Sequence, residues 1–240
     1  MEGWTARVRP HLWRWPSASN RATVGAMKTL HALSLLAALL LAACVGNEVR
    51  GSGNVATEAR TVPEFASLDV SGGWRVEITV GTPQSVEISG DDNLLPLVRT
   101  EMKDGALVVD SKENLVPKGE LTLRIRVANI HRIESSGSSK FAVHGVKNER
   151  LFVDLSGSAQ FEADGTTKRL DVVVSGSADV DTRALESEKA FVKISGSGAA
   201  KVNATKAIDA SISGSGAVRY TGSPAEVRRN VSGSGSIDPL

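Results

Sequence analysis

The sequence predicts an all-β fold, a parallel β-helix or β-solenoid with about 19 residues per coil and a more irregular N-terminal part that contains antiparallel hairpins. The first observation is a Ser-Gly-Ser tripeptide that occurs six times, with central glycines that step by 20, 19, 20, 18 and 19 residues. The second is an alternation of apolar and polar residues before each tripeptide, typical of a strand with one buried face. The third is a small residue two positions after each glycine, which allows the chain to bend sharply. The tripeptide glycines are Gly137, Gly157, Gly176, Gly196, Gly214 and Gly233.

The first element in chain order is an N-terminal leader. Residues 1–26 are rich in Trp and Arg and are interpreted as an upstream extension or a mis-called start, with Met27 as the true start. The apolar run over 30–43 is too short to span a bilayer and ends in small residues. Residues 27–43 are therefore predicted to be a signal peptide, which would export the chain. A long basic n-region that begins at Met1 is the alternative.

Cys44 is the only cysteine of the chain and follows Leu41-Ala42-Ala43, a sequence that resembles the bacterial lipobox. The resemblance implies cleavage before Cys44 and acylation of its thiol and amine, so that several acyl chains anchor the protein stably in a membrane. A lone cysteine cannot form an internal disulfide, which favours this interpretation. Val45 in place of Asp gives no inner-membrane retention signal, so we expect an outer-membrane lipoprotein. The alternative is a plain secreted protein.

The mature chain is predicted to begin with a tether over 44–61 and to continue as a single solenoid domain over 62–238. Alternating apolar residues between 74 and 80 predict a strand, and Asp104-Gly105 predicts the turn of a hairpin. The polar residues 91–93 are expected to cap a single short helical turn. No long helix is expected after Cys44.

The repeats are expected to form two facing sheets, with equivalent side chains stacked at about 4.8 Å from coil to coil. In the last repeat, Arg229 occupies a position that is apolar in the others, where an inward charge would block edge-to-edge growth of the sheet. A register shift of this strand is the alternative. The first predicted inward column is Leu155, Val174, Ile194, Ile212 and Val231, and the facing one contains Phe141, Phe161 and Val180.

These features together resemble the bacterial head GIN domain family of adhesins. The repeated Ser-Gly-Ser-Gly/Ala turns carry the resemblance, together with the opening segment over 65–72, Asp91-Asp92-Asn93-Leu94-Leu95 and the stretch over 105–110. The resemblance covers about residues 62–237. It implies a parallel β-helix-like fold, a location in the cell envelope and an adhesive role.

Composition excludes several classes of function. After removal of residues 1–43 the chain holds 23 basic and 26 acidic residues, a net charge of −3, which is too balanced for a nucleic-acid partner. Few aromatic residues are present to stack on bases. Cofactors are not expected. The chain after residue 43 has two histidines, His131 and His144, and its one cysteine is expected to be lipidated, so no metal site is expected either.

Individual polar residues suggest no catalytic site. The serines have no histidine positioned as a base, so no catalytic residue is assigned. Serine rows beside the turn glycines could bind a glycan or accept a modification, although serine commonly bonds to turn backbone. Asp91, Asp92, Asp104 and Asp110 are better explained as a solvated loop or a helix cap than as a calcium site.

The sequence therefore predicts a non-catalytic, lipid-anchored β-solenoid of the cell envelope that binds a glycan or protein ligand or has a structural role. A carbohydrate-active β-helix enzyme is the alternative, and it would need clustered carboxylates on one face. An acyltransferase on a left-handed β-helix is disfavoured because the period does not divide into hexapeptides.

Overall fold

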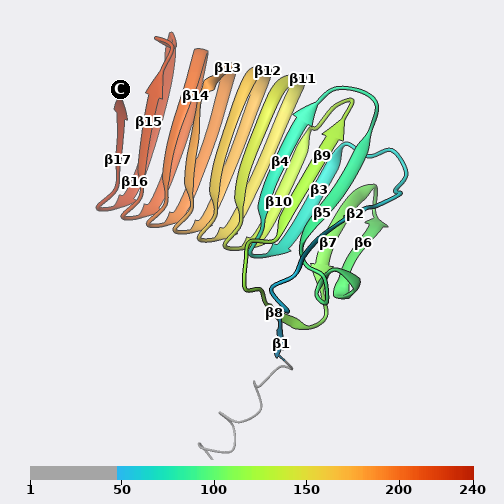
Figure 1. The fold of residues 1–240 in the computed structure, drawn as a ribbon. Coiled ribbons are helices and arrows are strands. Elements are labelled where there is room, and N and C mark those ends of the chain that lie inside the picture. The colour runs from blue at the N-terminus through green and yellow to red at the C-terminus, as the bar shows by residue number, and fades with distance from the viewer. Residues whose placement is uncertain (1–47) are drawn as a thin grey trace, which may run out of the picture. The chain divides into compact units, whose positions relative to one another are not determined.

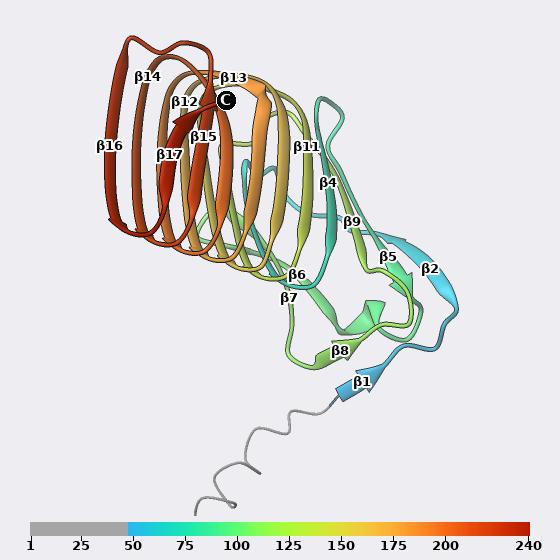
Figure 2. The same cartoon turned by 90° about the vertical axis from the view of Figure 1, so that its left-hand side faces the viewer.

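Each Ser-Gly-Ser repeat pairs in parallel with the repeat before it in the computed structural model, which describes residues 48–240. The result is a β-solenoid of about five turns with an irregular N-terminal part, as predicted. Figure 1 shows the coils in sequence order, and Figure 2 shows them as stacked loops. The strands of the repeats are β10 (Arg132–Gly137), β11 (Lys140–Gly157), β12 (Gln160–Gly176), β13 (Asp179–Gly196), β14 (Ala199–Gly214), β15 (Ala217–Thr221), β16 (Glu226–Gly233) and β17 (Ser236–Pro239).

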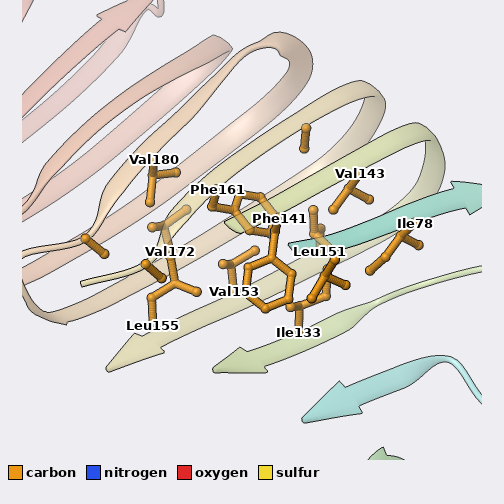
Figure 3. Close-up of a cluster of buried hydrophobic side chains, with 14 of the residues drawn as sticks. Ile78, Ile133, Phe141, Val143, Leu151, Val153, Leu155, Phe161, Val172 and Val180 are labelled. Atoms are coloured by element: carbon orange, nitrogen blue, oxygen red, sulfur yellow. The ribbon is translucent and has the colours of Figure 1, made fainter. Parts of the chain in front are cut away.

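The register between coils matches the predicted columns. Leu155, Val174, Ile194, Ile212 and Val231 are successive partners, because the alternation of apolar residues allows only registers that keep them on the inner face. Phe141, Phe161 and Val180 form the facing column. Figure 3 shows side chains of both columns meeting inside the coil, where Leu155, Phe161 and Val180 are fully buried.

Each coil bends twice, first at the Ser-Gly-Ser turn (the glycine corner) and again near the middle of the following long strand (the second corner). The second corner is less regular than the glycine corner. The register shifts between Val143 and Val146, between Glu162 and Gly165, and between Thr182 and Glu186. The unequal steps of 18 to 20 residues in the sequence are therefore absorbed at this corner, while the glycine corners stay aligned.

The solenoid begins before the first Ser-Gly-Ser tripeptide. β3 (Ser67–Gly72) and β4 (Arg75–Val80) form the first coil, and Gly72 pairs with Gly137. Between β4 and β10 the chain leaves the repeat and forms an excursion of strands and one short 3₁₀ helix. These elements are β5 (Ser85–Asp91), η2 (Leu95–Leu97), β6 (Val98–Lys103), β7 (Ala106–Ser111), β8 (Asn114–Val116) and β9 (Thr122–Val127).

The excursion returns twice to the first coil. β7 pairs in parallel with β3, and β9 pairs in parallel with β4, so each sheet gains one strand at this end. The predicted hairpin is confirmed: β6 and β7 are antiparallel, with Asp104 (φ 51°) and Gly105 (φ 81°) as its two-residue turn.

The predicted tether over 44–61 is wrong for residues 48–59. β1 (Glu48–Arg50) pairs with β8, and β2 (Val55–Ala59) pairs with β5. This polar segment has little apolar surface to bury. It is ordered because its backbone N–H and C=O groups form hydrogen bonds with β8 and β5. The folded unit therefore begins before residue 62. The predicted leader over 1–26 and the predicted signal peptide over 27–43 lie outside the described residues.

The predicted helix cap at 91–93 is also wrong. A short helix is present as η2, but its N-cap is Leu94 and no side chain caps it. The buried carboxylate of Asp91 instead accepts hydrogen bonds from the backbone N–H of Gly53 at 2.6 Å and of Lys118 at 2.9 Å. Asp91 thus fastens the N-terminal segment to the excursion.

No helix among residues 48–240 has the length and apolar character needed to cross a membrane.

Candidate functional site

The glycine corners require glycine for two reasons: the backbone has a positive φ, and the adjacent coil leaves no room for a Cβ atom. Gly176 has φ +129°, a conformation that side chains disfavour, and a Cβ atom there would lie 2.5 Å from the carbonyl oxygen of Gly157. That oxygen accepts a hydrogen bond from the N–H of Ser177 at 2.8 Å, which links the two coils. The same positive φ and close contact occur at the other predicted glycines, Gly137, Gly157, Gly196, Gly214 and Gly233.

The serines on either side of these glycines, together with Ser71 beside the equivalent Gly72, line one exposed edge of the solenoid, called here the serine ridge. Within residues 48–240 the only hydrogen bond made by their hydroxyls joins Ser71 Oγ and Ser136 Oγ at 3.0 Å. The expectation that these hydroxyls bond to turn backbone is therefore wrong, because the backbone N–H groups and carbonyls of the corners pair with the adjacent coil. Members are Ser71, Ser136, Ser138, Ser156, Ser158, Ser175, Ser177, Ser195, Ser197, Ser213, Ser215, Ser232 and Ser234.

The outer face of the sheet before the corners carries a column of aromatic and charged side chains. The guanidinium of Arg132 lies 4.4 Å from the ring centre of Phe152, and that of Arg169 lies 3.8 Å from the ring centre of Phe191. Asp171 stands between the two rings in register. Its burial alone would raise its pKa, but hydrogen bonds from Arg169 and Arg150 lower the pKa of Asp171. The outward aromatics were not identified from the sequence, although their alternation with inward residues could have revealed them.

A second outward column on the same face holds three stacked carboxylates. Asp69, Glu134 and Asp154 are register partners on β3, β10 and β11. Burial, and then the charge of Glu134, raise the pKa of both Asp69 and Asp154. Arg132 pairs with Glu134 and partly offsets the repulsion.

A groove of about 520 Å³ lies over the second corners of β11 to β13. There His144 Nδ1 is 2.7 Å from Asp164 Oδ2, and Asp181 is paired with Arg183 at 2.6 Å. The N–H of Gly145, followed by His144, lowers the pKa of Asp164, and Arg183 lowers the pKa of Asp181. A general acid for glycoside cleavage needs a raised pKa, so this pairing disfavours that role here.

The remaining predicted candidates are separate surface groups. His131 is exposed and contacts Ser67 Oγ at 3.2 Å, while His144 belongs to the groove. Asp104 forms a turn, and Asp110 is paired with Arg99 at 2.6 Å. Over residues 48–240 no three His, Cys, Asp or Glu side chains are grouped so that they could hold a metal ion. Cys44 lies outside the described residues.

Comparison with known proteins agrees with this geometry. The family model described as "Putative auto-transporter adhesin, head GIN domain" matches residues 64–224. This span includes the first coil, the excursion and most of the repeats. Among curated proteins there is no match.

Several solved structures are similar in fold. A putative adhesin from Bacteroides fragilis NCTC 9343 has a TM-score of 0.62 and 20% identity, over 80% of this chain and 100% of that one. A putative adhesin from Parabacteroides merdae ATCC 43184 has a TM-score of 0.57 and 22% identity, over 81% and 99%. A putative lipid binding protein from Parabacteroides distasonis ATCC 8503 has a TM-score of 0.54 and 20% identity, over 81% and 100%.

Proposed function

The chain belongs to the head GIN domain family of putative auto-transporter adhesins, and from this premise we propose that it is a non-catalytic binding protein of the cell envelope, anchored by lipid on Cys44. The ligand is a glycan or a protein displayed on a surface. The serine ridge is the observation that carries this proposal. Its hydroxyls repeat from coil to coil, and among residues 48–240 almost all of them lack a hydrogen-bond partner.

A repeating edge of this kind suits an extended ligand. Each hydroxyl can donate one hydrogen bond and accept others, and successive coils present the same group about 4.8 Å apart. Individually such contacts are weak in water, but several of them engaged by one polymer add up through a high effective concentration. This favours adhesion by many contacts over recognition in one deep pocket.

Binding to immobilised glycans and matrix proteins tests the ridge. We expect a triple variant, Ser156→Ala, Ser175→Ala and Ser195→Ala, to bind its surface ligand at least about tenfold more weakly, since three hydroxyls are lost from one contact line. The control replaces Thr79 and Ser85, which are exposed hydroxyl residues outside the ridge, with Ala. Equal binding by the ridge variant and wild type would contradict the proposal.

Membrane fractionation tests the anchor. We expect Cys44→Ser to move the protein from the membrane fraction to the soluble fraction, because the only thiol that can be lipidated is removed. Mass spectrometry of the mature N-terminus should find acyl chains in wild type and none in the variant. Unchanged fractionation, with no lipid mass on wild type, would refute the anchor.

The carboxylate column gives the enzymatic alternative one supporting observation. Asp69 and Asp154 have raised pKa values and adjoin Glu134, the kind of carboxylate pair that glycosidases use. The column lies on the outer face of a sheet, so we expect the purified protein to leave glycans intact. Release of reducing sugar that Glu134→Gln abolishes would favour the enzyme instead.

A further inference from the structure

We propose that a pocket at the first corner of the solenoid binds one sugar unit of a neutral glycan. The inference rests on the proposed function, because it names the ligand class and the place where binding is most specific. The pocket has a volume of about 360 Å³ and lies between the corner Ser71-Gly72-Gly73 and the excursion segment from Ser111 to Leu121. This volume is near the lower end of the range for small-molecule sites.

Gly73 is the first evidence for a ligand. It stands one residue after the corner glycine, where the other corners have serine, as in Ser138 and Ser158. Neither backbone conformation nor packing requires glycine here, because φ is not in the left-handed region and a Cβ atom would meet nothing within 4 Å. The missing side chain leaves open space at the pocket, which is how glycine allows a ligand to approach the backbone.

Trp74 provides an apolar wall. It occupies the position that is small in all later coils, such as Ala159 and Ala178, and it is 4% exposed. Its indole N–H donates a hydrogen bond to the carbonyl of Ser71 at 3.1 Å, which fixes the ring. Leu121, also buried, lines the pocket beside it. Small-molecule pockets are lined mainly by apolar and aromatic side chains of this kind, which here would contact the C–H groups of the sugar ring.

Glu113 and Asn114 provide the polar groups. Both line the pocket, and within residues 48–240 neither side chain makes a hydrogen bond or ion pair. A carboxylate accepts hydrogen bonds from hydroxyls, and an amide both donates and accepts, so the two can pair with neighbouring hydroxyls of a sugar. Ser71 lines the pocket and is also the first residue of the serine ridge, so a longer glycan can continue from the pocket along the ridge.

Tryptophan fluorescence tests the pocket directly. The chain has four tryptophans, so replacing Trp4, Trp13 and Trp15 with Phe in the full chain leaves Trp74 as the single reporter. The probes are the methyl glycosides of glucose, galactose, mannose and N-acetylglucosamine. We expect at least one of them to shift the emission of Trp74 in a saturable manner.

Two variants define the site. Gly73→Ser restores the residue found at the other corners and fills the open space, and Glu113→Gln removes the acceptor charge. We expect each to raise the Kd by about tenfold or more. Ser85→Ala, a change at an exposed serine outside both the pocket and the serine ridge, should leave the Kd unchanged. The melting temperature of Gly73→Ser should equal that of wild type, which separates a filled pocket from a damaged fold.

The proposal is overturned if no glycoside changes the emission of Trp74, or if Gly73→Ser binds as tightly as wild type. Binding of lysine methyl ester that depends on Glu113, without binding of any glycoside, would also overturn it, because the ligand class would then be cationic. Adhesion to the immobilised panel is measured in parallel. If adhesion persists in Gly73→Ser, the proposed function stands without the pocket, whereas loss of all adhesion in wild type would reject the function itself.

Discussion

At the scale of single residues, the stacking of the coils determines which residue type is possible at a few positions. The corner glycines are set by a positive φ and by the carbonyl of the coil beneath, so the sequence could reveal them through their fixed spacing. Gly73 could not be recognised in this way, because its role depends on Glu113, a residue forty positions away that the excursion brings to the same pocket.

Gly176→Val should destabilise the protein by about 3 kcal/mol or more, because a side chain would be forced into a strained φ and against the carbonyl of Gly157. Ser177→Ala should change the free energy of unfolding by no more than about 0.5 kcal/mol, since the Ser177 hydroxyl is exposed. Chemical denaturation of both variants checks the pair. Equal losses would contradict the assignment of the corner.

Ser135→Ala should stabilise the protein by about 1 kcal/mol, because the Ser135 hydroxyl is buried and finds no hydrogen-bond partner in the described part of the chain. Ser139→Ala is the matched control with the opposite sign. The Ser139 hydroxyl is also buried, but it donates to the carbonyl of Gly72 at 3.1 Å and accepts from the N–H of Trp74 at 3.2 Å. We expect this control to lose about 1 kcal/mol. Melting curves that shift both variants in the same direction would refute the comparison.

At the scale of elements, strands were predictable where one face is buried and not where both faces are polar. The repeats alternate strictly, and a register that keeps apolar residues inside is then the only one available. β1 and β2 have exposed or half-exposed side chains throughout and carry no such pattern, so they were expected to be a tether. Their folding depends on pairing with β8 and β5, which the local sequence does not encode.

Asp154→Asn should raise the stability at pH 7, by ~0.5 kcal/mol, because it removes one of three like charges stacked across neighbouring strands. The pKa of Asp154 in the folded state is raised above its ordinary value of 3.8. Between 3.8 and the raised pKa, the folded state holds the proton more tightly than the unfolded state, so the free energy of unfolding falls as the pH rises through this range. The gain from Asp154→Asn should therefore shrink as the pH falls toward 3.8 and below.

Asp171→Asn serves as the control for pH dependence. The pKa of Asp171 is lowered in the folded state, so its contribution to stability is present above its ordinary pKa and is lost as pH falls. We expect this variant to be less stable than wild type at pH 7, with a difference that narrows in acid. Thermal unfolding across pH 3 to 7 measures both variants. A loss of stability in Asp154→Asn at pH 7, as in Asp171→Asn, would show that the carboxylate column is not repulsive.

At the scale of the whole folded unit, the two ends of the solenoid differ. The first coil is covered by β7 and β9, which pair with β3 and β4. The excursion that contains these two strands lies outside the repeat of about 19 residues, so the repeat spacing could not predict it. In the last described coil β16 is exposed throughout, with Val227 and Val231 partly open to solvent. Arg229 pairs in register with Ala210, so the predicted inward charge is present and the alternative of a register shift is wrong.

Arg229 is expected to limit association through this end. Its guanidinium is hydrogen-bonded to the Tyr220 hydroxyl and lies 5.6 Å from the ring centre, which keeps a charge over the open coil. Arg229→Val would continue an apolar column and remove that charge, leaving an exposed strand edge able to pair with another molecule. We therefore expect Arg229→Val to self-associate at lower protein concentration than wild type in sedimentation velocity experiments. Arg228→Val removes an outward charge from the same strand and should sediment like wild type; if both variants associate equally, charge loss alone and not the inward position of Arg229 is responsible.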